Sequence, residues 1–253
     1  MVERTLRSIL SQSLQPTKVT LFLPKYFDRF DTAVDCPNIP RDKRVEIVRV
    51  DRDLGPVTKV AYARNHHSDL SDDDRVVICD DDHIYPENWL QLLLDESDRV
   101  GDDPVVMSGL NFEFPGSLLP RAKFKGASYR IHRLLSPGSR RSIGPWSRSG
   151  YVDIAEGWAG IMIKKGLIPL GLDRIPDFAK YVDDIWISAC LARDGLYPWL
   201  VAPGLSWSLD HNPGCEHALK VTKWNDRSRN ELNQFAIDHL SDMFQIWQSG
   251  QGK

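Results

Sequence analysis

The stretch Val76-Val77-Ile78-Cys79-Asp80-Asp81-Asp82-His83 decides the fold that we expect for this chain. Four apolar residues lead directly into three consecutive carboxylates, and Pro86 follows at a place that suits the first turn of a helix. A short, wholly apolar run is typical of a buried parallel strand. The carboxylates are therefore expected at the carboxyl end of a buried strand, which is where open α/β sheets bind their ligands.

Three adjacent aspartates can be interpreted in two ways. Their carboxylates repel one another unless a cation or solvent compensates, and hard oxygen ligands of this kind suit Mg²⁺ or Mn²⁺. Aspartates are also common in solvated turns and are favourable near helix N-termini. This stretch alone leaves both a metal site and a solvated helix cap open.

On both sides of this stretch, the pattern alternates between strands and helices. Strands are predicted at residues 19–23, 45–50, 75–79 and 105–110. Helices are predicted at residues 3–14, from Gly55 to about residue 68, and at 86–100, 183–193 and 225–248. This rhythm indicates an α/β protein with a mostly parallel central sheet flanked by helices. The pattern opens on a helix, whereas such folds usually open on a strand, so we expect the first strand to lie upstream or to be absent.

Composition narrows the class of protein. A chain of 253 residues can form one α/β domain, and its net charge of -3 gives no hint of a nucleic-acid partner. No apolar run is long enough to span a bilayer, and no signal peptide is visible. The four cysteines are scattered without a CxxC pair, which favours a reducing compartment and gives no zinc motif. We therefore expect a cytoplasmic protein without a transmembrane segment.

Three further stretches carry local predictions. Trp158 lies among small residues in Glu156-Gly157-Trp158-Ala159-Gly160, where it could stack on a sugar or be buried in the core. Asp183 and Asp184 open a helix, either as caps or as a catalytic pair. Residues 136–150 are rich in Ser, Gly, Arg and Pro and are predicted to form a long loop. His66 and His67 are expected on the exposed face of their helix.

Taken in order, these elements resemble the GT-A glycosyltransferases, and most closely the inverting family 2 type. Five stretches carry the resemblance: Thr5-Leu6-Arg7-Ser8-Ile9-Leu10-Ser11-Gln12 before an apolar strand, Ala63-Arg64-Asn65, Asp80-Asp81-Asp82 as the DxD motif, Glu156-Gly157-Trp158-Ala159-Gly160, and Asp183-Asp184 followed by Leu191 and Gly195. The series covers roughly residues 3–200. It departs from the family in lacking the first strand and in having Asp-Asp where the family has Glu-Asp.

The resemblance implies a fold and an activity. It implies a single GT-A-like domain over residues 1–253, with a nucleotide-binding half at 1–110 and an acceptor half with the C-terminal helix at 111–253. It also implies transfer of a sugar, with inversion, from a nucleotide-sugar, expected to be a UDP-sugar, to a carbohydrate or other hydroxyl acceptor. Mn²⁺ or Mg²⁺ would be the cofactor.

The resemblance further implies roles for individual residues. Asp82 would bind the metal directly, Asp80 would lie near the metal or the ribose, and the late His211 could complete the coordination. Asp184 would be the base, with Asp183 as a close alternate. The remaining implied contacts are with the donor, from Asp53, Lys59, Arg64, Asp80 and Asp81, and with the acceptor, from Glu156, Gly157 and Trp158. From the residues alone, Lys59 and Arg64 could equally pair with nearby acids, and His211 could be a surface residue.

Other classes of protein remain open. An apolar strand that ends in DxD also opens haloacid-dehalogenase-type phosphatases, in which Thr or Val usually follows the second Asp, whereas His83 follows here. A sugar-phosphate nucleotidyltransferase shares the fold and the metal chemistry but would need a glycine-rich basic loop, and none is visible. An inactive carbohydrate-binding relic is the third class, although carboxylates are present at both acidic positions.

Overall fold

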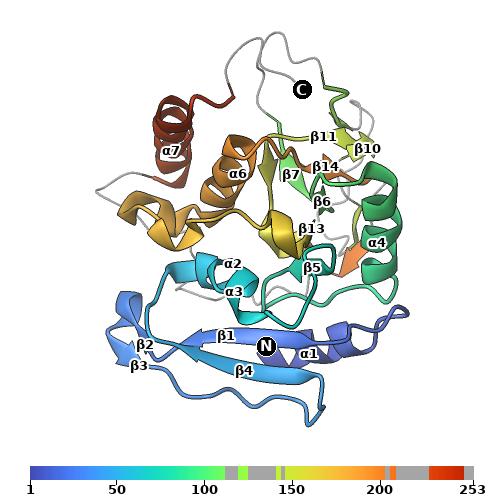
Figure 1. Cartoon of the computed structure of the whole chain (residues 1–253), viewed down its shortest axis with the longest axis vertical. Coiled ribbons are helices and arrows are strands. Elements are labelled where there is room, and N and C mark those ends of the chain that lie inside the picture. Colours follow the sequence, from blue (N-terminus) through green and yellow to red (C-terminus); the bar gives the residue numbers. More distant parts are fainter. Residues whose placement is uncertain (112–118, 125–140, 144–145, 203–205, 209–227, 248–253) are drawn as a thin grey trace.

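The computed structural model describes residues 1–111, 119–124, 141–143, 146–202, 206–208 and 228–247. They form a mixed α/β structure in which helices lie on both sides of a five-stranded sheet (Figure 1). The sheet has the strand order β11-β14-β6-β13-β5. Its strands are β5 (Arg75–Ile78), β6 (Val105–Val106), β11 (Gly150–Tyr151), β13 (Ile161–Lys164) and β14 (Trp199–Leu200).

The central sheet is mixed, whereas a mostly parallel sheet was expected. β13 pairs antiparallel with both β5 and β6, β11 pairs antiparallel with β14, and β14 pairs parallel with β6. β5, β6 and β14 therefore run in one direction, as the alternating pattern predicts, and β13 inserts between two of them in the opposite direction. The sequence pattern predicts strands but not which strands become neighbours, so this insertion was not foreseen.

β1 (Val19–Pro24) and β4 (Val45–Val50) form a separate two-stranded parallel sheet, in register from Val19 opposite Val45 to Pro24 opposite Val50. Figure 1 shows this pair at one end of the molecule, beside α1. A cavity of about 1000 Å³ lies against both β1 and β5 and extends to residues 80–82. In the described part of the chain, no strand pairing joins β1 to β5.

Helix α1 (Val2–Leu10) holds the loop that follows β5. The Thr5 hydroxyl donates to the carbonyl of Asp81 (2.8 Å), and the Ser8 hydroxyl accepts from the backbone N–H of Tyr85 (3.0 Å). The buried side chain of Gln12 donates to the carbonyl of Pro86 (2.7 Å) and accepts from the N–H of Leu90 (3.0 Å). The helix is shorter than the predicted 3–14, since the residues after it turn back to bond this loop.

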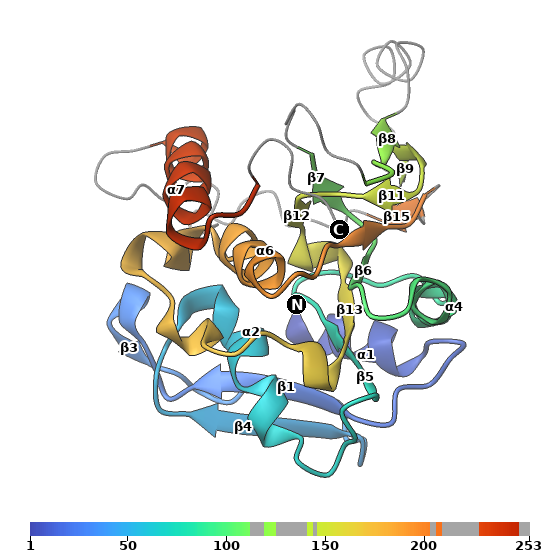
Figure 2. The ribbon, with the colours of Figure 1, turned by 45° about the horizontal axis from the view of Figure 1, so that its top comes forward.

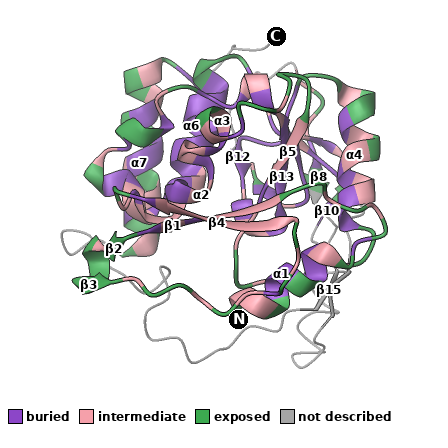
Figure 3. Ribbon diagram, turned by 60° about the horizontal axis from the view of Figure 1, so that its bottom comes forward, coloured by how far each residue is buried: buried purple, intermediate pink, exposed green. Residues whose placement is uncertain are grey.

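The other helices confirm most of the predicted positions. α4 (Trp89–Val100), α6 (Asp183–Arg193) and α7 (Arg229–Phe244) lie within or on the predicted ranges. α6 is buried along most of its length (Figure 3), and α7 packs beside it (Figure 2). Ser228 and Glu231 form a capping box that begins α7. No helix among the described residues is long and apolar enough to cross a membrane.

Three predicted elements differ from the structure. The helix expected from Gly55 to about residue 68 is divided into a 3-10 turn (Gly55–Val57), α2 (Thr58–Ala61) and α3 (Ala63–His66). The strand expected at 105–110 is divided into β6 and β7 (Gly109–Leu110), and β7 pairs with β12 (Ile154–Ala155) instead of joining the central sheet. The expected loop at 136–150 contains β9 (Arg141–Ile143) and β10 (Trp146–Arg148), which pair with β15 (Ser206–Ser208) and β8 (Lys123–Phe124).

Gly160 is required by the packing of Trp89. Its φ is +101°, and a Cβ on it would lie 2.5 Å from Cζ2 of Trp89. Trp89 is fully buried, stacks on Tyr85 with ring centroids 4.1 Å apart, and donates to the carbonyl of Ala159 (2.9 Å). The indole therefore has little freedom to move away.

We expect Gly160→Ala to lower the free energy of unfolding, because overpacking against a fixed ring typically costs about 1–3 kcal/mol. Gly101→Ala is the matched control, because Gly101 also has a positive φ (+83°) but a Cβ there would meet nothing within 4 Å. Urea denaturation of both variants measures the difference. If both variants lose the same free energy of unfolding, backbone strain, and not contact with Trp89, causes the destabilisation.

Candidate functional site

Lys59 joins the two acidic stretches of the sequence. Residues 80–82 follow the end of β5, and Asp183 and Asp184 open α6. The Nζ atom of Lys59, on α2, lies 2.6 Å from Oδ1 of Asp80 and 3.0 Å from Oδ2 of Asp183. Two acidic groups that are distant in sequence therefore meet at one point, and a single ammonium group binds both.

The charges at this point perturb one another. Burial acts to lower the pKa of Lys59, but attraction by Asp183, Asp80 and Asp184 outweighs it and raises the pKa well above its usual value. Burial and repulsion by Asp183 raise the pKa of Asp184, and attraction by Lys59 and a hydrogen bond from Gly157 only partly oppose them. Lys59 thus stays charged, while Asp184 holds its proton to a higher pH than an ordinary aspartate.

Gly157 leaves room for this contact. Its N–H donates to Oδ1 of Asp184 (2.9 Å). A Cβ on Gly157 would lie 3.0 Å from Nζ of Lys59 and 3.2 Å from Oδ1 of Asp184. Any larger residue would crowd both groups. The neighbouring Glu156 accepts a hydrogen bond from the hydroxyl of Ser108, which fixes its carboxylate to the loop after β6.

Asp80, Asp82 and His83 form a candidate metal site. Each offers one ligand atom, and these atoms all lie within 4.8 Å of one another. Nδ1 of His83 lies 2.6 Å from Oδ1 of Asp82. Two carboxylates and an imidazole suit Mn²⁺, which accepts both oxygen and nitrogen ligands, and the carboxylates also suit Mg²⁺. The carboxylate of Asp81 is not part of this group, and His211 lies outside the described residues.

His83 is a candidate ligand that the sequence motifs do not predict. Its position directly after the carboxylates is the signal that could have indicated it. Its ring lies 5.3 Å from the ring of Trp158, at an interplanar angle of 33°. Trp158 is partly buried, so one part of its side chain packs against the core and the rest remains accessible.

Tyr85 fixes the end of β5 against the turn that carries Trp158. Its hydroxyl lies 3.1 Å from the carbonyl of Asp80 and 3.0 Å from the carbonyl of Trp158, and the side chain is buried. The acidic residues after β5 and the glycine-rich turn at residues 156–160 are therefore held together by a buried phenol.

The cavity that lies against β1 and β5 also reaches this site. Its lining includes four residues predicted to contact the donor, which are Asp53, Lys59, Asp80 and Asp81, together with Asp82. Arg64 does not line it. The guanidinium of Arg64 donates instead to the carbonyl of Ile168 (2.6 Å), a backbone contact that is neither of the two alternatives predicted for this residue.

No protein-family model matches this chain, and a search of curated proteins finds no similar sequence. The resemblance to the GT-A glycosyltransferases therefore stays a prediction from the sequence motifs.

Proposed function

We propose that this chain is a metal-dependent inverting glycosyltransferase of the GT-A type. It would transfer a sugar from a nucleotide-sugar, expected to be a UDP-sugar, to a hydroxyl group of a carbohydrate or another acceptor. One observation carries the proposal: Lys59 brings the DxD-like carboxylates and the Asp183–Asp184 pair together beside a cavity of about 1000 Å³. A transferase of this kind needs a diphosphate site and a base next to each other.

The residues after β5 would bind the diphosphate of the donor. Asp80, Asp82 and His83 would hold Mn²⁺ or Mg²⁺, which would neutralise the leaving nucleoside diphosphate. Lys59 adds a cation at the same place, and its raised pKa keeps it charged. Asp53, in the loop after β4, lines the same cavity and would contact the nucleoside of the donor.

The start of α6 and the turn at residues 156–160 would bind and activate the acceptor. Asp184 would accept the proton of the attacking hydroxyl, because its raised pKa makes it a better base near neutral pH than an ordinary aspartate. Asp183 is bound to Lys59, so its carboxylate would mainly position Lys59 and Asp184. Trp158 would stack on the acceptor sugar beside His83.

A product assay tests the proposal. The chain is incubated with Mn²⁺ and a panel of nucleotide-sugars, and the released species are identified. Release of nucleoside diphosphate that depends on an added acceptor supports the proposal. Inorganic phosphate from a phosphomonoester would indicate a phosphatase, and pyrophosphate from a nucleoside triphosphate and a sugar phosphate would indicate a nucleotidyltransferase. Sugar binding without any product would indicate a carbohydrate-binding relic.

The role of Trp158 gives a separate prediction. Trp158→Ala is expected to raise the KM for the acceptor about 2- to 10-fold, since an aromatic contact contributes about 0.5–1.5 kcal/mol, and to leave donor affinity unchanged. Trp158→Phe keeps an aromatic face and should restore most of the acceptor affinity. Steady-state kinetics of both variants measures this. Unchanged kinetics with a less cooperative unfolding transition would identify Trp158 as a core residue.

A further inference from the structure

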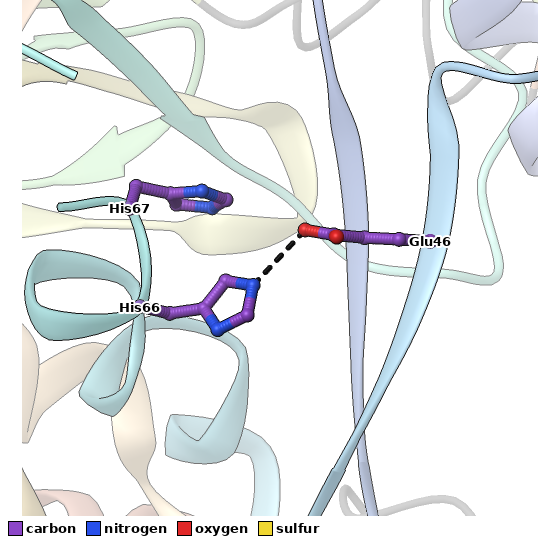
Figure 4. Close-up of side chains that lie close together, drawn as sticks. All are labelled: Glu46, His66 and His67. Atoms are coloured by element: carbon purple, nitrogen blue, oxygen red, sulfur yellow. Dashed lines mark hydrogen bonds and ion pairs between the residues drawn. The ribbon is translucent and has the colours of Figure 1, made fainter. Parts of the chain in front are cut away.

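A second group of potential metal ligands lies between β4 and the end of α3. Glu46 is on β4, His66 is the last residue of α3, and His67 follows it with a backbone outside the helical region (φ -90°, ψ 57°). Figure 4 shows both rings and the carboxylate directed toward one another. One ligand atom from each residue lies within 4.8 Å of the other two.

Hydrogen bonds and a contact between two rings join the residues of this group. Nε2 of His66 lies 3.0 Å from Oε1 of Glu46, and the two imidazole rings are 4.9 Å apart and nearly perpendicular. The Thr20 hydroxyl donates to Oε1 of Glu46 (2.7 Å) and lies 3.4 Å from Nε2 of His67. Thr20 is opposite Glu46 in the β1–β4 register, so the sheet itself places the carboxylate and the hydroxyl side by side.

His67 is poorly satisfied for a buried imidazole. The residue is only 7% exposed, although both histidines were expected on an exposed helix face. The prediction is wrong for His67 because α3 ends at His66 and the backbone then departs from the helix. Among the described residues, Nδ1 of His67 has no hydrogen-bond partner, and Nε2 has only the long contact with Thr20. Buried polar groups in native proteins are usually paired, so the unpaired Nδ1 of His67 indicates a position at which an ion could bind.

We propose that Glu46, His66 and His67 bind a divalent transition-metal ion such as Zn²⁺. Two imidazoles and one carboxylate are a ligand set that zinc accepts, with the fourth position left for water. Thr20 and His67 line the cavity described above, so an ion and its water could reach this position from the cavity. A bond to the metal through one ring nitrogen would compensate for the burial of His67.

One neighbouring cation would compete with a metal ion at this group. Lys18 competes for Glu46 at 3.2 Å, but its side chain is 36% exposed and can turn into solvent.

The test uses Co²⁺, whose visible absorption becomes much stronger when four-coordinate binding to protein ligands replaces its six waters, in the Asp80→Asn/Asp82→Asn variant so that the first candidate site does not contribute. One equivalent should bind saturably. His67→Gln should weaken binding more than about tenfold, since even changes to groups behind metal ligands cost about 10- to 100-fold. His239→Gln, at an exposed histidine of α7, is the control and should bind as before.

Thermal unfolding of the full chain keeps the proposal testable if His67→Gln folds poorly. Zn²⁺ at 100 times its Kd should raise the melting temperature of the otherwise unchanged chain, because a ligand that binds only the folded state stabilises it. The same addition to Glu46→Gln should give a smaller rise. Absence of saturable Co²⁺ binding, or equal binding in His67→Gln and His239→Gln, would overturn the proposal and leave a hydrogen-bonded cluster that joins α3 to the sheet.

Discussion

Asp82→Ala is expected to abolish the metal dependence of nucleoside diphosphate binding. Asp82 lies shortly after β5, its Oδ1 is 2.6 Å from Nδ1 of His83, and Asp80 offers a third ligand atom within 4.8 Å of the other two. With Asp82 replaced, one carboxylate and one imidazole remain, and Asp80 is already paired with Lys59. Mg²⁺ and Mn²⁺ are commonly bound through one or two carboxylates together with substrate phosphates, so removal of a ligand should affect both metal and diphosphate binding.

Calorimetric titration of UDP with and without Mn²⁺ measures this effect. The unchanged chain should bind UDP more tightly with Mn²⁺, and Asp82→Ala should bind it equally weakly in both conditions. Asp73→Ala is a suitable control because Asp73 belongs to another run of three aspartates, at residues 72–74, and its side chain is 87% exposed. If the unchanged chain binds UDP equally well with and without Mn²⁺, the metal has no part in donor binding.

Local sequence patterns predicted the strand before residues 80–82 and the helix that begins at Asp183. The apolar runs at β1, β4 and β5 were placed to within a residue or two, because a short apolar run bounded by turn residues has few other solutions. The start of α6 was also predicted correctly at Asp183. These positions sufficed to place carboxylates after a strand and at the start of a helix, although β5 was expected to be buried and three of its four residues are only partly buried.

Long-range neighbours could not be predicted in this way. The antiparallel insertion of β13 between β5 and β6 depends on which edges meet, and that information is absent from a local pattern. The contact of Lys59 with Asp80 and Asp183 has the same origin, so the sequence left ligand binding and structural pairing equally open for this lysine. Arg64, on the next helix α3, instead donates to the carbonyl of Ile168.

Asp184→Asn is expected to lower turnover about 10²- to 10⁴-fold, the usual cost of losing a general base. Asparagine keeps the shape of the side chain and can still accept the hydrogen bond from Gly157, but it cannot take up the proton of the acceptor. Donor and metal affinity should change little, because Asp184 is outside the group formed by Asp80, Asp82 and His83. The kcat and the donor Kd are measured together, with Asp238→Asn at an exposed position of α7 as the control.

Asp183→Asn distinguishes the base from its neighbour. Asp183 is bound to Lys59, so its loss should disturb Lys59 and Asp184 but leave a group that can accept a proton. A smaller loss of turnover is therefore expected than for Asp184→Asn. If Asp183→Asn is inactive while Asp184→Asn turns over normally, the base is Asp183. If both variants turn over normally, neither residue is the base and the inverting mechanism fails.

The pH dependence of turnover gives an independent check on Asp184. A base acts only when deprotonated, so turnover should be lost as the pH falls through the pKa of Asp184, which burial and Asp183 raise above the ordinary aspartate value. The acid limb should therefore lie at a higher pH than for an unperturbed carboxylate. Lys59 opposes that shift, so Lys59→Met should move the acid limb to still higher pH, whatever it does to the maximal rate. An acid limb that stays at the same pH in Lys59→Met would show that the titrating group does not sense Lys59, and is therefore not Asp184.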